Sequence, residues 1–164
     1  MDKRRLLLIA SALLATYALG GGVLQGRAQY PAWAQVGAAE FPAYHAAMSA
    51  GLVRVFIPFS MLSALVSLGV LVWCPPGVSR VLALAAVALN ATLIGVTAFV
   101  FLPLQAEFDT VKSMEAITDL VRYDVLRTVP GVLLLGTHFA MLAQMGATTP
   151  RRMLEAAPTG EPRS

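Results

Sequence analysis

The chain has 164 residues, of which 57% are hydrophobic and only 13% are charged, and its formal net charge is +3. A soluble domain carries about 25% charged residues, so this composition excludes an ordinary soluble domain and favours a membrane protein. Nucleic-acid binding is not expected, because the basic residues flank apolar runs instead of forming a patch. The single cysteine, Cys74, excludes an internal disulfide and a multi-cysteine metal site.

The first apolar run covers residues 6–24 and directly follows Lys3, Arg4 and Arg5. About 20 apolar residues suffice for a helix to cross a bilayer, so this run predicts a membrane-spanning helix. The alternative is a secretory signal over residues 1–28. Because the apolar run is longer than the core of a signal peptide, which has about 7–15 residues, an uncleaved span is favoured.

The connection between the first two spans, residues 25–50, contains aromatic residues that suit a membrane interface. They are Tyr30, Trp33, Phe41 and Tyr44. We expect a helix to begin near Glu40, because Pro42 is tolerated in a first helical turn, and to continue into the second span, residues 51–73. One face of this helix would carry Phe41, His45, Met48 and Leu52, which follow a spacing of three to four residues.

A short basic turn over residues 74–80 leads to the third span, residues 81–104. In residues 107–127, apolar and charged side chains alternate at helical spacing, which predicts an amphipathic helix with Ser113 as its N-cap. We expect this helix to run into the fourth span, residues 128–146, with a bend at Pro130. Residues 148–164 are rich in proline and poor in apolar residues, which predicts a disordered tail.

The distribution of basic residues predicts the orientation of the spans. Seven of the twelve Lys and Arg residues lie at the N-terminus, in the 74–80 turn and in the tail, and four lie in the other two connections. The positive-inside rule therefore places both termini in the cytoplasm and the protein in the cytoplasmic membrane. The expected fold is an all-α membrane four-helix bundle over residues 1–147. An extracytoplasmic amphipathic helix would lead into its fourth span.

Several polar residues are expected near the middle of the bilayer, where polar groups serve packing or a site. Asn90 and His138 are central, and Thr16, Tyr17, Ser60 and Ser63 fall at similar depth. Two interpretations stay open. Asn90 and His138 hydrogen-bond to each other or to a neighbouring helix and hold the bundle together, or they line a pocket in which His138 titrates.

A second polar group is expected at the extracytoplasmic ends of the helices. Its members are Glu40, His45, Arg54, Gln105, Glu107, Asp124 and Arg127. Arg54 lies about one turn inside its span, so it can also extend outward to the interface without serving a site. Convergence of the others would form a ligand pocket between helix ends.

Three segments resemble a family of small four-span membrane proteins that includes the fungal anthrone oxygenases. The segments comprise Tyr30-Pro31 with Trp33, Val36-Gly37, Glu40-Phe41 and Tyr44-His45, then Leu102–Gln105, and finally Leu120-Val121 with Asp124 and Leu126-Arg127-Thr128. The resemblance implies a four-helix membrane bundle that oxidises a hydrophobic aromatic such as an anthrone. Many relatives carry a second histidine where this chain has Met48, so a paired-histidine site does not carry over.

The leading hypothesis is therefore a membrane-embedded, oxygenase-like oxidoreductase that acts on a lipophilic small molecule. The expected catalytic residues are His45 or His138 as general base, Arg127 as the group that stabilises an oxyanion, and Asp124. The expected substrate-binding residues are Gln105, Asn90, Arg54, Glu40, Tyr44 and Trp33. No metal site is predicted, and no nucleotide, flavin or haem motif indicates a cofactor, which stays undetermined.

The alternative is a non-enzymatic membrane protein, either a small-molecule binder or an accessory subunit of a complex. The run Gly20–Gly22 permits close approach of another helix and fits this alternative equally well. The expected partners are the lipid bilayer and a hydrophobic small molecule, and a homo-oligomer is left open.

Overall fold

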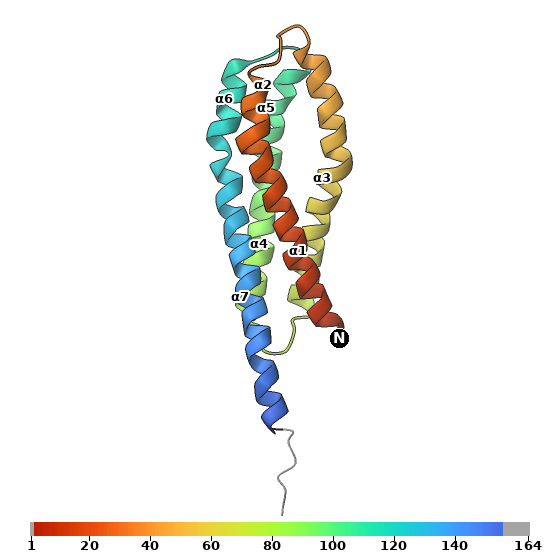
Figure 1. The fold of residues 1–164 in the computed structure, drawn as a ribbon, viewed down its shortest axis with the longest axis vertical. Coiled ribbons are helices and arrows are strands. Elements are labelled where there is room, and N and C mark those ends of the chain that lie inside the picture. The colour runs from red at the N-terminus through yellow and green to blue at the C-terminus, as the bar shows by residue number, and fades with distance from the viewer. Residues whose placement is uncertain (1, 156–164) are drawn as a thin grey trace, which may run out of the picture.

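The structure, a computed structural model, describes the backbone of residues 2–155 and the side chains of residues 2–147. This part of the chain is all-helical and forms four long segments that run side by side (Figure 1). By length and composition, all four are able to cross a membrane: Lys3–Trp33, Phe41–Val72, Arg80–Asp109 and Met114–Ala147.

Three of the four segments are interrupted helices. The first consists of α1 (Lys3–Leu24), a π-helical turn η1 (Gln25–Gln29) and α2 (Tyr30–Trp33), and the second is the single helix α3 (Phe41–Val72). The third contains α4 (Arg80–Val96), a second π-helical turn η2 (Thr97–Phe101), α5 (Leu102–Ala106) and a 3₁₀ turn η3 (Glu107–Asp109). The fourth contains α6 (Met114–Tyr123) and α7 (Val125–Glu155). All four segments are longer than the predicted spans.

The four segments close into a ring in which α1 packs against α3 and α7, and α4 packs against α3 and α7. The start of α1 and the end of α7 lie at one end of the bundle, here called the termini end (Figure 1). The opposite end contains α2, α5 and α6 and is called the α6 end.

Each end has its own hydrophobic core. The core toward the termini end includes Leu8, Ala15, Val70, Ala83, Ala86, Leu134 and Met141. Its alanines leave room for close approach of the helix backbones. The core at the α6 end is largely aromatic and includes Tyr30, Trp33, Phe41, Phe101 and Phe108 together with Ile117 and Leu120 of α6.

Two predicted helix starts are confirmed. Helix α3 begins at Phe41 with Pro42 in its first turn, where a missing N–H group removes no helical hydrogen bond. Ser113 caps α6, since its hydroxyl accepts a hydrogen bond from the Ala116 N–H at 3.1 Å. The prediction succeeded in both cases because a cap depends on residues within one turn of each other.

The fourth segment is interrupted ahead of Pro130, the position at which the sequence predicted a bend. Helix α7 continues through Pro130, and the interruption of the fourth segment falls at Asp124, between α6 and α7. The Asp124 carbonyl accepts hydrogen bonds from the N–H groups of Arg127 and Thr128, and its carboxylate accepts one from the Thr128 hydroxyl at 3.0 Å. The main-chain carbonyl of Asp124 thus accepts the first hydrogen bonds of α7, and its carboxylate contacts the Thr128 side chain in the same turn.

The predicted tail differs from the structure in its first part. Helix α7 extends through Glu155, so its backbone covers residues 148–155 of the expected disordered segment. Residues 156–164 lie outside the residues that the structure describes.

Candidate functional site

The centre of the candidate site is Arg127, in the first turns of α7. Its Nη1 donates a hydrogen bond to Gln25 Oε1 at 3.0 Å, and its Nη2 donates to Tyr30 Oη at 3.2 Å and to Asp124 Oδ1 at 3.1 Å. Gln105 adds a further link, because its Nε2 donates to Tyr30 Oη at 3.3 Å. These residues, together with Thr128, are called the arginine cluster below, and they come from the first, third and fourth segments.

The arginine cluster is buried, so its charges have to be paired. The Arg127 and Asp124 side chains are only 11% and 6% exposed, respectively. Both oxygens of Asp124 are used, one by Arg127 and the other by the Thr128 hydroxyl. The guanidinium carbon also lies 3.7 Å from the centroid of the Phe101 ring, a distance at which a cation is attracted to an aromatic face. Arg127 is thus held in one orientation from several sides.

The two π-helical turns place residues in this cluster. Gln25 is the first residue of η1, and Phe101 is the last residue of η2. A π turn adds one residue to a helical turn and is frequent at functional sites. Gly26, also in η1, lets α1 approach Asp124, because a Cβ at this position would lie 2.2 Å from the Asp124 Cγ atom.

His45 lies in a separate aromatic box beside the cluster. The box consists of His45 with Trp33, Phe41 and Phe108, whose ring centroids lie 5.3, 6.1 and 5.3 Å from the imidazole. His45 Nε2 lies 3.2 Å from Ser49 Oγ, within hydrogen-bond distance. Its Nδ1 has no hydrogen-bond partner and lies 3.7 Å from a carboxylate oxygen of Asp109, whose side chain is 70% exposed. The box joins the arginine cluster through Trp33, whose ring centroid lies 5.0 Å from that of Tyr30.

A cavity of about 270 Å³ lies between the four segments. Its polar residues at the α6 end are Gln25, Ser49, Gln105, Arg127 and Thr128, those toward the termini end are Ser63 and Asn90, and Ser60 and Thr97 lie between these two groups. The walls between them are apolar, with Leu19, Phe56 and Leu93 among the lining side chains. From Asn90 to Gln105 the lining extends over about 20 Å at a helical rise of 1.5 Å per residue. The cavity is therefore narrow, elongated along the bundle and mostly apolar.

Helix α3 forms the loosest wall of the cavity. Between His45 and Ser63, none of its residues is fully buried. The residues of its inner face in this stretch, such as Leu52, Phe56 and Ser60, line the cavity and are half-buried. The packing of α3 is thus interrupted over this stretch by the cavity.

A second polar cluster crosses the bundle on the side of the cavity that faces the termini end. It is called the serine–histidine network. His138 Nδ1 lies 2.8 Å from the Leu134 carbonyl, which can only accept, so Nδ1 carries the hydrogen. His138 Nε2 then accepts from the Ser11 hydroxyl at 2.7 Å, and Ser11 Oγ accepts from Ser67 at 3.0 Å. This arrangement uses both nitrogens of a neutral, fully buried imidazole.

Asn90 completes the network from α4. Its side-chain nitrogen donates to Ser67 Oγ at 3.1 Å and to the Ala86 carbonyl at 3.0 Å. Its Oδ1 accepts from the Ser63 hydroxyl at 3.4 Å. Asn90 and His138 are therefore linked through Ser67 and Ser11, not directly. Thr16 and Ser60 bond to carbonyls of their own helices, and Tyr17 is partly exposed, so these three stay outside the network.

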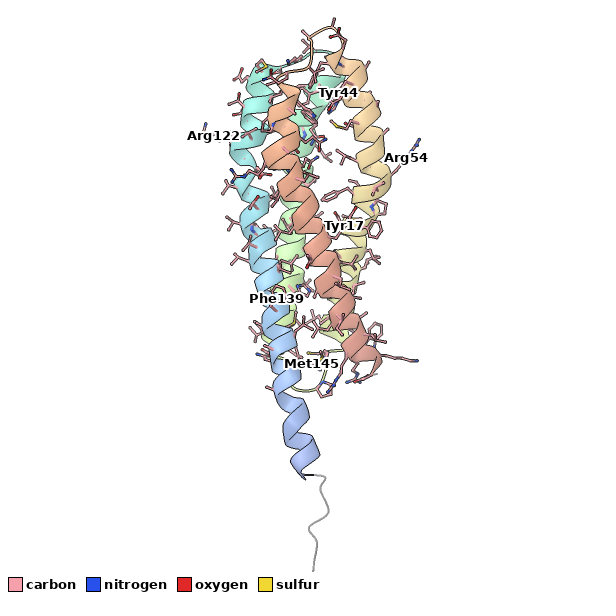
Figure 2. All side chains as sticks on the ribbon, viewed as in Figure 1. Tyr17, Tyr44, Arg54, Arg122, Phe139 and Met145 are labelled. Carbon is pink, nitrogen blue, oxygen red and sulfur yellow. The ribbon has the colours of Figure 1, made fainter. Side chains whose placement is uncertain are left out.

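The structure brings some of the sequence-predicted site residues together and leaves others apart. Asp124, Arg127 and Gln105 meet in the arginine cluster, Trp33 and His45 lie in the adjoining aromatic box, and Asn90 lines the far end of the cavity. His138 does not line the cavity. Glu40, Tyr44 and Arg54 are exposed, and Arg54 points away from the bundle (Figure 2).

Several contributors were not predicted as site residues, among them Gln25, Ser49, Phe101, Thr128 and, as a hydrogen-bonding residue, Tyr30. Gln25 was hidden because the sequence suggested a helix end at residue 24, whereas the helix continues through a π turn. A polar residue directly after an apolar run was the available signal, but only the fold shows that it meets Arg127, a residue 102 positions away.

Among the side chains that the structure describes, those of residues 2–147, no group of three His, Cys, Asp or Glu residues is placed to hold a metal ion. The chain matches no protein-family model, no curated protein and no solved structure. The geometry of the site is therefore the basis for its proposed chemistry.

Proposed function

We propose that the protein is an integral protein of the cytoplasmic membrane, with four spans and with both termini in the cytoplasm. The exterior of the bundle supports this proposal, because many large apolar side chains, such as Leu65, Val81 and Phe99, are well exposed. In water such a surface would promote aggregation. The basic residues of the termini end, Lys3 to Arg5 and Arg80, agree with a cytoplasmic location for that end.

In this orientation α6 is an extracytoplasmic amphipathic helix. It buries Ala116, Ile117 and Leu120 and exposes Glu115 and Arg122, and Figure 2 shows Arg122 pointing away from the bundle. Reporter fusions after Gln35 and Lys112 should report the outside, and fusions after Gly77 and Ser164 the cytoplasm. A fusion after Gly77 that reports the outside would overturn the orientation.

We further infer that the cavity binds a lipophilic small molecule that carries an oxygen substituent, and that the protein is an oxygenase-like enzyme for that molecule. The observation that carries this inference is the apolar cavity with Arg127 at its α6 end, held by Gln25, Tyr30 and Asp124. An apolar cavity with a few fixed polar groups is typical of small-molecule sites. The resemblance to the family of the anthrone oxygenases supports an aromatic substrate.

The proposed reaction oxidises an activated methylene group of the substrate to a carbonyl group. A base removes a proton from this carbon, and the negative charge that develops is spread over the aromatic rings and the substrate's oxygen, which accepts a hydrogen bond from Arg127. Dioxygen is the oxidant. One of its atoms enters the product as the carbonyl oxygen, and the other leaves as water with the two hydrogens of the methylene group.

His45 is the better candidate for the base of the two histidines. It does not line the cavity, but the Ser49 hydroxyl does, and it lies 3.2 Å from His45 Nε2. A proton can therefore pass from the cavity to His45 through Ser49. His138 is less suitable, because both of its nitrogens are already engaged in the serine–histidine network.

The alternative function, a non-enzymatic small-molecule binder or accessory subunit, is favoured by one observation. Among the side chains of residues 2–147, no carboxylate and no histidine lines the cavity, so a general base has only indirect access through Ser49. Binding of an aromatic ligand without conversion would support this alternative.

The test uses the purified chain in lipid nanodiscs, incubated with anthrone in air, with the quinone product quantified by chromatography. Conversion should exceed that of empty nanodiscs and should be lost in Ser60→Phe, which adds a ring inside the cavity. Leu62→Phe is the matched control, because it adds the same ring at an exposed position of α3 outside the cavity lining. Equal conversion by all variants and by empty nanodiscs would exclude the oxygenase function.

A further inference from the structure

The charge balance at the α6 end of the cavity restricts the kind of oxygen that the cavity can accept. Of the described residues that line the cavity, Arg127 is the one with a charged side chain. Its charge is already matched, because Asp124 lies 3.1 Å away and is itself almost fully buried. The guanidinium group and this carboxylate together present a neutral pair to the cavity.

The hydrogens of Arg127 are also largely occupied. Nη2 donates to both Tyr30 and Asp124, which uses both of its hydrogens, and Nη1 donates one to Gln25. Nε is buried without a partner. A carboxylate is gripped well by arginine when two adjacent N–H groups point at its two oxygens. Nη1 therefore keeps one N–H group without a protein acceptor, and a single N–H group on this nitrogen matches a single acceptor oxygen.

A carboxylate ligand would also add a second negative charge to a pair that is already neutral. Burying a charge without a partner is strongly unfavourable, whereas a ketone or hydroxyl oxygen needs only a donor. The amide groups of Gln25 and Gln105 line the same end of the cavity and can supply further donors. The local chemistry therefore fits an uncharged oxygen and not a carboxylate.

We propose that the cavity selects uncharged, oxygen-bearing ring systems over carboxylates, and that Asp124 is the residue that sets this specificity. The proposal rests on the proposed function in one respect, namely that the cavity is a ligand site. Gly26 contributes to the same specificity, because a side chain at this position would displace the Asp124 carboxylate from its place beside Arg127. Asp124 acts through the charge it removes, so it is a specificity-determining residue and not a catalytic one.

The experiment compares three probes that share one ring skeleton: anthrone with a neutral ketone, anthracene with no oxygen, and anthracene-9-carboxylate with a full charge. Binding is measured by equilibrium dialysis against the chain in nanodiscs of zwitterionic lipid, and uptake by empty nanodiscs is subtracted. The wild-type protein should bind anthrone at least tenfold more tightly than the carboxylate, with anthracene in between.

Asp124→Asn keeps the size and shape of the side chain but removes its charge. Arg127 would then face the cavity as an unmatched cation, so the ratio of carboxylate affinity to anthrone affinity should rise at least tenfold over that of the wild type. The matched control is Asp119→Asn, which removes the same charge from α6 at a residue outside the cavity lining. This control should keep the wild-type ratio of affinities.

Two failures can be told apart. If the probes bind but the wild type does not distinguish the ketone from the carboxylate, or if Asp124→Asn leaves the ratio unchanged, the specificity proposal is wrong and the ligand site stands. If no probe binds better than to empty nanodiscs, or if Ser60→Phe does not weaken binding, the cavity is not a ligand site and both proposals fall.

If Asp124→Asn fails to fold, Gly26→Ala is the second variant. It should raise the affinity for the carboxylate relative to that for anthrone.

Discussion

The serine–histidine network and the α6 end of the bundle are both buried and polar, yet they differ in how completely their groups are paired. In the network, His138, Ser11, Ser67, Asn90 and Ser63 form a continuous series of hydrogen bonds across all four segments. At the α6 end, three buried side-chain nitrogens lack a partner: Trp33 Nε1, His45 Nδ1 and Arg127 Nε. Among the described side chains, these are the buried polar atoms without a hydrogen bond.

This difference separates a structural role from a functional one. Satisfied polar groups in a membrane bundle fix the position of one helix against another at little cost. Unsatisfied buried groups are unfavourable, so they call for an explanation such as a ligand, water or a catalytic role. Of the three residues with an unpaired nitrogen, Arg127 lines the cavity, while Ser63 and Asn90 of the network line its other end with their hydrogen bonds made. This contrast supports a structural role for the network and agrees with the proposed binding role of the α6 end.

The largest effect is expected from Arg127→Ala. It leaves the buried Asp124 carboxylate without its cation, and breaking a buried pair in this way costs about 3–5 kcal/mol of stability. The variant should also lose anthrone binding. Thermal melting in detergent and dialysis in nanodiscs measure the two effects. Arg127→Lys should not restore binding, because an ammonium group cannot reach three partners in fixed directions.

The double variant Arg127→Met with Asp124→Asn separates stability from binding. It removes both charges together, so most of the lost stability should return, while anthrone binding should stay weak. If the double variant melted as early as Arg127→Ala, the ion pair would not be the source of the instability.

The second effect concerns the proposed proton route and sharpens the comparison between the two histidines. His45→Gln should reduce turnover about 100-fold, because general bases contribute factors of about 10²–10⁴, and should leave anthrone affinity unchanged. An ionisation seen in wild-type turnover between about pH 5 and 8 should disappear, since an amide does not titrate there. His138→Gln is the control and should keep this ionisation. The reverse pattern would move the base to the serine–histidine network.

The third effect tests the close approach of α1 to Asp124. Gly26→Ala places a methyl group against the Asp124 carboxylate, and overpacking of this kind costs about 1–3 kcal/mol. Gly20→Ala is the matched control, because nothing lies within 4 Å of a Cβ at that position. It should leave the melting temperature unchanged or raise it, since alanine favours helix over glycine. Equal melting of both variants would contradict the tight contact at Gly26.

The smallest effect is expected inside the serine–histidine network. His138→Gln can still hydrogen-bond to Ser11, and a single interhelical hydrogen bond in a membrane averages about 0.6 kcal/mol. The melting temperature should therefore fall slightly while anthrone binding stays at the wild-type value. A variant that melts normally but loses binding or turnover would assign His138 to the site instead.

Much of the fold could be predicted because its signals are local. The four long helices follow from four apolar runs, and the starts at Phe41 and Ser113 follow from residues within one turn. The π turns were not predicted, since an inserted residue leaves no clear mark in an apolar pattern. The interruption at Asp124 was not predicted either, because neither glycine nor proline marks residues 123–125.

The sequence by itself determined that this is an all-helical chain of four apolar segments with polar residues at two depths. Hydropathy and helix caps depend on neighbouring residues, so they can be read along the chain. Only the tertiary structure decided the partners: Arg127 meets Gln25 and Tyr30, and His138 meets Ser11 instead of Asn90. These pairs are separated by about a hundred residues or more along the chain. Which side chain faces which is set by the packing and rotation of whole helices, and the π turns η1 and η2 change that rotation where the arginine cluster forms.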